Sequence, residues 1–144
     1  MPPAPLAPPA PPGSAARRLL VPVALLGSVA AAFAYVGTVD PNEPGHYPVC
    51  PLLQFTGLYC PGCGGLRSAH AFIRGDFPAA LGANALAVVG YLVFAVVWLL
   101  WAVSAARGRK LRIEFGSAHV WVVGVLIVGF TVVRNLPVGA WLHP

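Results

Sequence analysis

Long apolar runs without charged side chains, separated by shorter polar segments, are the main pattern of this chain. Three of these runs, residues 19–39, 85–106 and 115–133, contain no Asp, Glu, Lys or Arg. As an α-helix, each run is about 30 Å long, which matches the thickness of the hydrocarbon core of a bilayer. The pattern therefore predicts an all-α integral membrane protein with three transmembrane helices.

The segments between the runs complete the expected organisation. Residues 1–16 are rich in proline and have no charged side chain, so we expect a disordered tail. The rest is expected to form a single membrane domain, 17–144, with transmembrane helices at 19–39, 85–106 and 115–133, a long connection at 40–84, a basic loop at 107–114 and a short tail at 134–144. One alternative stays open, because residues 17–34 also resemble a cleavable signal peptide.

The basic residues predict the orientation of the protein in the membrane. Only 9% of the residues are charged, and most of the basic ones flank apolar runs, at Arg17, Arg18 and residues 107–112. Three spans put both groups on one side, which the positive-inside rule makes the cytoplasmic side of the cell membrane. We therefore expect a cytoplasmic N-terminus, with the connection 40–84 and the C-terminus outside. The same distribution argues against nucleic-acid binding.

All three cysteines of the chain lie in the connection, at positions 50, 60 and 63. The stretch Cys60-Pro61-Gly62-Cys63-Gly64 has the form of a metal knuckle, and equally that of a dithiol redox pair. Outside the cytoplasm, a disulfide is a third alternative, with Cys50–Cys60 the easiest bridge. A structural role, a metal site and redox chemistry all stay open at this point.

An amphipathic helix is expected after Gly65. Leu66, Ala69, Ile73 and Phe77 fall near one face, while Arg67, His70 and Arg74 fall on another. The segment is too short to cross a bilayer, so we expect an interfacial or re-entrant helix. It should end at the sequence Gly75-Asp76-Phe77-Pro78, and Asn84 should cap the second transmembrane helix.

Spacing limits the set of metal ligands. A helix starting at Cys63 would put His70 about 10 Å away along its axis, too far to share an ion. His46 is therefore the expected fourth ligand. Arg67, one turn beyond Cys63, and the N-terminus of the helix should favour the Cys63 thiolate.

The polar positions together resemble the DUF2752 family of small bacterial membrane proteins. The residues that carry this resemblance are Cys50, Pro51, Thr56, Gly57, Cys60, Pro61, Gly62, Cys63, Gly64, Arg67, Gly75, Asp76, Asn84, Arg134 and Asn135. The chain departs from the family pattern at Leu66, where a hydroxyl residue is common, and at Ala85, where proline is common. The resemblance implies the membrane architecture, but no established activity.

Three functional hypotheses follow. We favour a non-enzymatic component of the membrane, with a cysteine-rich outer cap that binds a membrane-protein partner or a second copy of the chain. In this cap we expect Asp76 to pair with Arg67 or Arg134, because charges at membrane depth seek partners. The alternatives are a thiol oxidoreductase that uses Cys60 and Cys63, and a metal-binding loop for which zinc is the candidate ion.

Overall fold

The computed structural model of the chain describes residues 15–143 except 110, 113 and 115. Its elements in order are α1 (Ala15–Thr38), α2 (Pro51–Thr56), α3 (Gly65–Ile73), α4 (Phe77–Ala106), α5 (Ser117–Arg134) and the 3₁₀-helix η1 (Pro137–Leu142). These residues contain no strand, so the predicted all-α class is confirmed. The predicted tail lies outside the described residues, apart from its last two positions.

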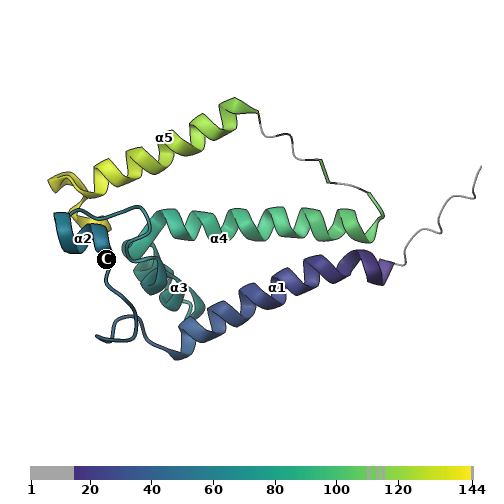
Figure 1. Cartoon of the computed structure of the whole chain (residues 1–144), viewed down its shortest axis with the longest axis horizontal. Helices are drawn as coiled ribbons and strands as arrows, with labels where there is room; N and C mark the ends of the chain where they lie inside the picture. Colours follow the sequence, from purple (N-terminus) through teal and green to yellow (C-terminus); the bar gives the residue numbers. More distant parts are fainter. Residues whose placement is uncertain (1–14, 110, 113, 115, 144) are drawn as a thin grey trace, which may run out of the picture.

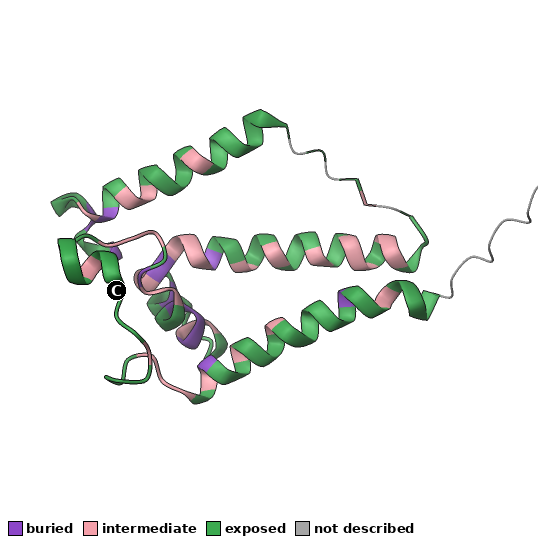
Figure 2. Cartoon of the chain, in the orientation of Figure 1, coloured by how far each residue is buried: buried purple, intermediate pink, exposed green. Residues whose placement is uncertain are grey.

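Helices α1, α4 and α5 are long and apolar enough to cross a membrane, with mean hydropathies of 2.2, 2.5 and 1.7. Most of their residues are exposed, and Figure 2 shows this exposure along the length of all three helices. Helices whose apolar side chains are exposed on every side need an apolar solvent. The three predicted transmembrane helices are therefore confirmed.

Helix α4 begins earlier than the predicted start of the second run, because two helical segments meet at a kink. Asn84 interrupts the helix with an extended backbone (φ −164°, ψ 94°). Its Oδ1 atom accepts a hydrogen bond from the N–H of Ala87 at 2.9 Å, so Asn84 caps the longer segment as expected. Asp76 caps the shorter segment by accepting from the N–H of Ala79 at 3.0 Å.

The short amphipathic helix predicted after Gly65 is α3, which packs against both α1 and α4 (Figure 1). His70 is buried, and its Nδ1 atom lies 2.8 Å from the carbonyl oxygen of Val36 in α1. On the other side, the hydroxyl of Tyr91 in α4 donates to the carbonyl of Gly65 at 3.0 Å. These contacts fix α3 and thereby the turn that precedes it.

Helix α5 stands apart from α4 along most of its length (Figure 1) and turns back into η1. Gly139 of η1 lies against the carbonyl of Val133, where no Cβ atom has room. The Nε2 atom of His143 lies 2.6 Å from the carbonyl oxygen of Arg134. Helix α2, η1 and the turn before α3 lie at the same end of the molecule (Figure 1). We call this end the cysteine end (residues 40–65 and 134–143).

Candidate metal centre

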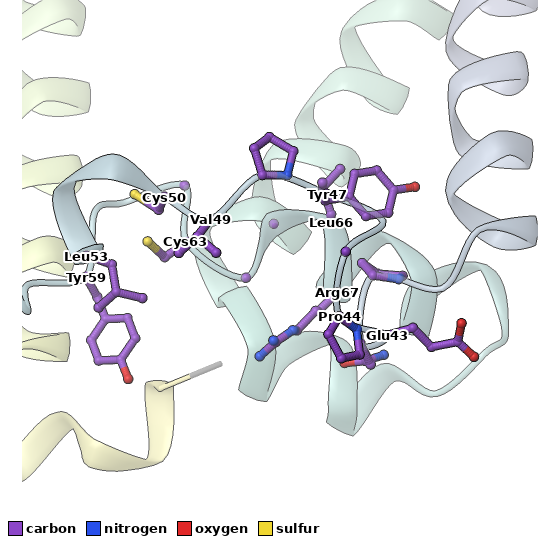
Figure 3. A pocket seen from close by; sticks show the side chains of 17 residues that line it. Glu43, Pro44, Tyr47, Val49, Cys50, Leu53, Tyr59, Cys63, Leu66 and Arg67 are labelled. Atoms are coloured by element: carbon purple, nitrogen blue, oxygen red, sulfur yellow. The ribbon is translucent and has the colours of Figure 1, made fainter. Parts of the chain in front are cut away.

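The three cysteines come together at the cysteine end. The Sγ atoms of Cys50 and Cys60 are 3.5 Å apart, those of Cys60 and Cys63 are 3.2 Å apart, and all three lie within 4.8 Å of one another. Cys63 is buried, and the other two are half-buried. None of the three forms a disulfide. In Figure 3 the sulfur atoms of Cys50 and Cys63 lie side by side at the edge of a cavity.

Cys50 is positioned by helix α2, which the sequence did not predict. Cys50 is the N-cap residue, and Pro51 follows at the first helical position, where its missing N–H costs nothing. The helix ends at Gly57, whose left-handed backbone (φ 72°) suits glycine. The hydroxyl of Thr56 donates to the carbonyl of Leu52 at 2.6 Å, within the same short helix.

Cys60 and Cys63 are positioned by a tight turn that leads directly into α3. The N–H of Cys63 donates to the carbonyl of Cys60 at 3.1 Å, and the N–H of Gly65 donates to the carbonyl of Gly62 at 2.9 Å. Gly64 then takes a left-handed conformation (φ 76°) as the N-cap of α3. The chain thus forms a tight turn, the knuckle, which brings the two thiols together and suits either a metal site or a dithiol redox pair.

Asn84 holds this knuckle from the side of α4. Its side chain is 1% exposed, and its Nδ2 atom donates to the carbonyls of Pro61 and Cys63, both at 2.9 Å. Because its Oδ1 atom caps the helix at the same time, one amide group satisfies three backbone groups. The kink in α4 therefore has a structural reason: it brings Asn84 to the knuckle.

Arg134 holds the knuckle from the side of α5. The residue is 0% exposed, and its Nη1 atom donates to the carbonyls of Cys60 (3.1 Å) and Cys63 (3.0 Å). Its Nη2 atom donates to the carbonyl of Leu142 at 2.9 Å, which ties η1 to the same centre. Next to it, the side chain of Asn135 donates to the carbonyl of Tyr59 and accepts from the N–H of Tyr59, both at 2.8 Å.

The predicted pairing of Asp76 with an arginine is wrong. Asp76 caps α4, and within the described part of the chain neither Arg67 nor Arg134 forms an ion pair. The prediction failed because carbonyl oxygens can also satisfy the N–H donors of an arginine, and Arg134 donates to three of them. Arg134 is consequently a buried cation without an acidic side chain beside it.

The predicted fourth ligand, His46, does not join the thiols. Among the described residues, the group of side chains close enough to hold a metal consists of the three cysteines alone. The Nδ1 atom of His46 lies 3.1 Å from the carbonyl oxygen of Asp40 and 3.6 Å from the carboxylate of Glu43. His70 stays away from the thiols as expected, with its Nε2 atom 3.7 Å from the Asp40 carboxylate.

The thiols of Cys50 and Cys63 differ in acidity. The backbone N–H of Leu53 and the neighbouring thiols lower the pKa of Cys50 to about 7. Burial, followed by the hydrogen bond with Cys60, raises the pKa of Cys63 to about 12. The expectation that Arg67 and the N-terminus of α3 favour the Cys63 thiolate is therefore wrong, because burial in the knuckle outweighs them. The helix N-terminus that favours a thiolate is that of α2, at Cys50.

A cavity of about 690 Å³ lies next to the thiols. Cys50 and Cys63 form part of its wall, together with Tyr47, Tyr59 and the exposed side chain of Arg67 (Figure 3). Gly75, the remaining glycine of the motif, lies outside this region and ends α3 with a left-handed backbone (φ 77°). The knuckle is thus held by side chains of α4 and α5, and its residues Gly62, Cys63 and Gly64 line the cavity.

The sulfur distances separate the chemical alternatives. A disulfide needs a sulfur–sulfur distance of about 2 Å. Four thiolates around one zinc at about 2.3 Å give sulfur–sulfur distances of about 3.8 Å in a tetrahedron. The two observed distances, 3.2 Å and 3.5 Å, are much longer than a disulfide bond and somewhat shorter than the tetrahedral value, and all three atoms lie within 4.8 Å of one another. The three sulfur atoms are therefore not bridged, and they lie close enough together to share one metal ion.

Several partners of this centre could not be found from the sequence. The carbonyl of Leu142 and the backbone of Tyr59 take part through main-chain atoms, which carry no signature in a sequence. A usable signal was the pair Arg134-Asn135 directly after an apolar run. A polar pair at the end of a membrane helix points to a polar site at that depth.

Comparison with protein families gives one match. A family model described as a protein of unknown function, DUF2752, matches residues 50–98. The matched segment contains the three cysteines, α3 and Asn84, so the family resemblance expected from the sequence is confirmed over residues 50–98. Arg134 and Asn135, which also suggested the family, lie outside the matched segment. No curated protein and no solved structure matches the chain.

Proposed function

We propose that this protein, which matches the DUF2752 family model over residues 50–98, is a non-enzymatic membrane protein that binds one zinc ion through the thiolates of Cys50, Cys60 and Cys63. The observation that carries the proposal is the approach of three sulfur atoms to within 4.8 Å of one another without a disulfide. Thiolate is a ligand that zinc prefers, and a knuckle that supplies two of its ligands is common in structural zinc sites.

The buried charge of Arg134 supports thiolates over neutral thiols. A buried guanidinium is costly without an anion nearby, and the Nε atom of Arg134 has no hydrogen-bond partner among the described residues. The rings of Tyr59 and Phe130, 5.5 Å and 5.0 Å from its Cζ atom, attract the charge but do not neutralise it. Three thiolates and a divalent ion together carry one negative charge. Arg134 is bonded to the carbonyls of two of the three cysteines and neutralises that charge. With neutral thiols, or with a disulfide, Arg134 would have no counter-charge.

The metal would act as a link between separate segments. Cys50 belongs to the start of α2, whereas Cys60 and Cys63 belong to the turn before α3. Helix α2 has no buried residue, so apolar packing contributes little to its position. A metal bond to Cys50 would fix it against the knuckle, since metal binding contributes its free energy to the folded arrangement.

The proposed location is the non-cytoplasmic side of a cell membrane. Support comes from the opposite end of the molecule, where the guanidinium of Arg18 lies beside Gly108. The two basic groups of the sequence are therefore neighbours, as the positive-inside rule requires for a cytoplasmic end. Labelling of Cys50 by a membrane-impermeant thiol reagent in whole cells, after metal removal, tests this orientation. If Cys50 is labelled only after the cells are broken open, the proposed orientation is wrong.

Metal analysis of the protein purified in detergent tests the proposed site. We expect about one equivalent of zinc per chain, and loss of most of it in Cys63→Ser. The matched control is His46→Ala, which should keep its zinc because His46 lies apart from the thiols. A purified protein that contains no zinc, and takes up none when zinc is added under reducing conditions, would refute the proposal.

A thiol oxidoreductase is the second candidate, favoured by the 3.2 Å between the Sγ atoms of Cys60 and Cys63. In this reaction the two thiols would lose two protons and two electrons and form a disulfide, while a disulfide of a partner protein would be reduced to two thiols. Alkylation followed by mass measurement discriminates the candidates. A Cys60–Cys63 disulfide in the protein as isolated would favour redox chemistry, whereas three alkylated cysteines after metal removal would favour zinc.

A further inference from the structure

The proposed zinc site has one coordination position that the described part of the chain does not fill. Zinc takes four ligands, and only three cysteines lie close enough to one another. His46, the nearest histidine in the sequence, is engaged with Asp40 and Glu43 instead. Zinc with three protein ligands and an open position binds water or an external molecule.

Two of the three proposed ligands, Cys50 and Cys63, line a cavity with the size of a small-molecule site. Its volume is about 690 Å³, within the range of about 300–1,000 Å³ that is typical for such sites. The cavity reaches from Cys50 and Cys63 to Arg67, and Val49, Leu53 and Leu66 add apolar wall. An external ligand of the zinc would therefore enter this cavity, which is partly open to solvent.

The chemistry of the wall selects the ligand. Arg67 lines the cavity and forms no ion pair with a described residue. The acidic side chain of the wall, Glu43, lies 3.6 Å from the Nδ1 atom of His46 instead, so the planar guanidinium of Arg67 is available to a carboxylate. At the other end of the cavity, a zinc ion that already has three thiolates favours another soft donor. The two ends of the ligand thus differ: one binds a soft metal and the other an arginine.

We propose that a small thiol that carries a carboxylate binds in this cavity, with its sulfur atom on the zinc and its carboxylate on Arg67. This proposal rests on the zinc site proposed above. On binding, the thiol loses its proton to solvent and its sulfur replaces a water molecule on the zinc. No oxidation state changes, and no co-reactant is needed.

The test uses the full-length protein in detergent, loaded with cobalt in place of zinc. Cobalt bound to thiolates absorbs light in the near ultraviolet in proportion to the number of sulfur ligands. N-acetylcysteine is the probe, because it has one thiol and one carboxylate. We expect the absorption to rise by about one third on saturation, as three sulfur ligands become four. Two matched probes define the recognition: N-acetylcysteine amide lacks the carboxylate, and N-acetylalanine lacks the thiol.

Two variants assign the carboxylate to its partner. In Arg67→Gln, the affinity for N-acetylcysteine should fall at least about tenfold, while the weaker affinity for the amide should stay unchanged. Arg74→Gln is the matched control. Arg74 belongs to the same polar face of the predicted amphipathic helix as Arg67, but it is not part of the cavity wall. It should bind both thiols like the unmodified protein.

The outcomes separate this proposal from the one on which it rests. If cobalt binds with three sulfur ligands but N-acetylcysteine changes nothing, or binds no more tightly than its amide, the ligand proposal is wrong and the metal site stands. Removal of the cobalt by the probe would also refute the ligand proposal, because the sulfur would then compete with the site instead of completing it. If cobalt does not bind to the thiols at all, the metal site itself is wrong.

Discussion

Arg134 is the residue on which the cysteine end depends most, and Arg134→Gln is the most informative single change. The side chain is 0% exposed and donates three hydrogen bonds to carbonyls, those of Cys60, Cys63 and Leu142. Glutamine is shorter and has no charge, so it would leave most of these carbonyls without a donor. It would also remove the counter-charge of the thiolates.

The magnitude follows from these contacts. Removing the charged partner from a buried network of this kind costs about 3–5 kcal/mol. For a domain of this size, that corresponds to a Tm lower by roughly 10 °C or more. Residues that orient metal ligands typically change the metal affinity by about 10- to 100-fold, and we expect a loss in this range.

Thermal unfolding in detergent, followed by tryptophan fluorescence, measures the first effect, and competition with a metal indicator measures the second. The control is Arg67→Gln, which removes an exposed arginine without a hydrogen bond to a described residue and should leave the Tm within about 1 °C. If Arg134→Gln unfolds at the same temperature as the unmodified protein and keeps its metal affinity, the role assigned to Arg134 is wrong.

Three further predictions concern the same region. Asn84→Ala removes two hydrogen bonds to the knuckle and the cap of the longer segment of α4, and should lower the free energy of unfolding in detergent by about 2–4 kcal/mol. An unchanged Tm would contradict the role of Asn84 in holding the knuckle. Gly139→Ala should lower the Tm by several degrees, because the added Cβ atom has no room beside the carbonyl of Val133. Gly124→Ala, where the added atom meets open space, should leave the Tm unchanged, and equal melting curves for the two variants would contradict the close contact of Gly139 with Val133. In metal-free protein the lowered pKa of Cys50 puts its thiolate at half population near pH 7, so alkylation of Cys50 should rise steeply from pH 6 to 8 while Cys63 stays protonated. A midpoint of Cys50 alkylation near pH 9 would contradict the lowered pKa of this thiol.

The membrane architecture could be predicted from the sequence because it depends on solvent alone. Three uncharged runs of bilayer length have few alternatives to helices in lipid. The cap by Asn84 was also predictable, since a polar residue directly before an apolar run is a local signal. Local rules of this kind need no knowledge of the tertiary structure.

The partners at the cysteine end could not be predicted, because they depend on contacts across the chain. Arg134 reaches the knuckle across more than seventy positions of sequence and binds main-chain atoms, whereas the sequence analysis searched for an acidic side chain such as Asp76. His46 was chosen as a ligand for its closeness to Cys50 in the sequence. The structure turns it toward Asp40 instead.

The family match leaves the chemistry of the three thiols as the central question. X-ray absorption at the zinc edge of the purified protein addresses it directly, because the spectrum reports the number and distance of the ligand atoms. We predict three sulfur atoms at about 2.3 Å from the zinc, with a lighter atom in the remaining position when no external thiol is present. A first shell of nitrogen and oxygen alone would contradict the assignment of Cys50, Cys60 and Cys63 as the metal ligands.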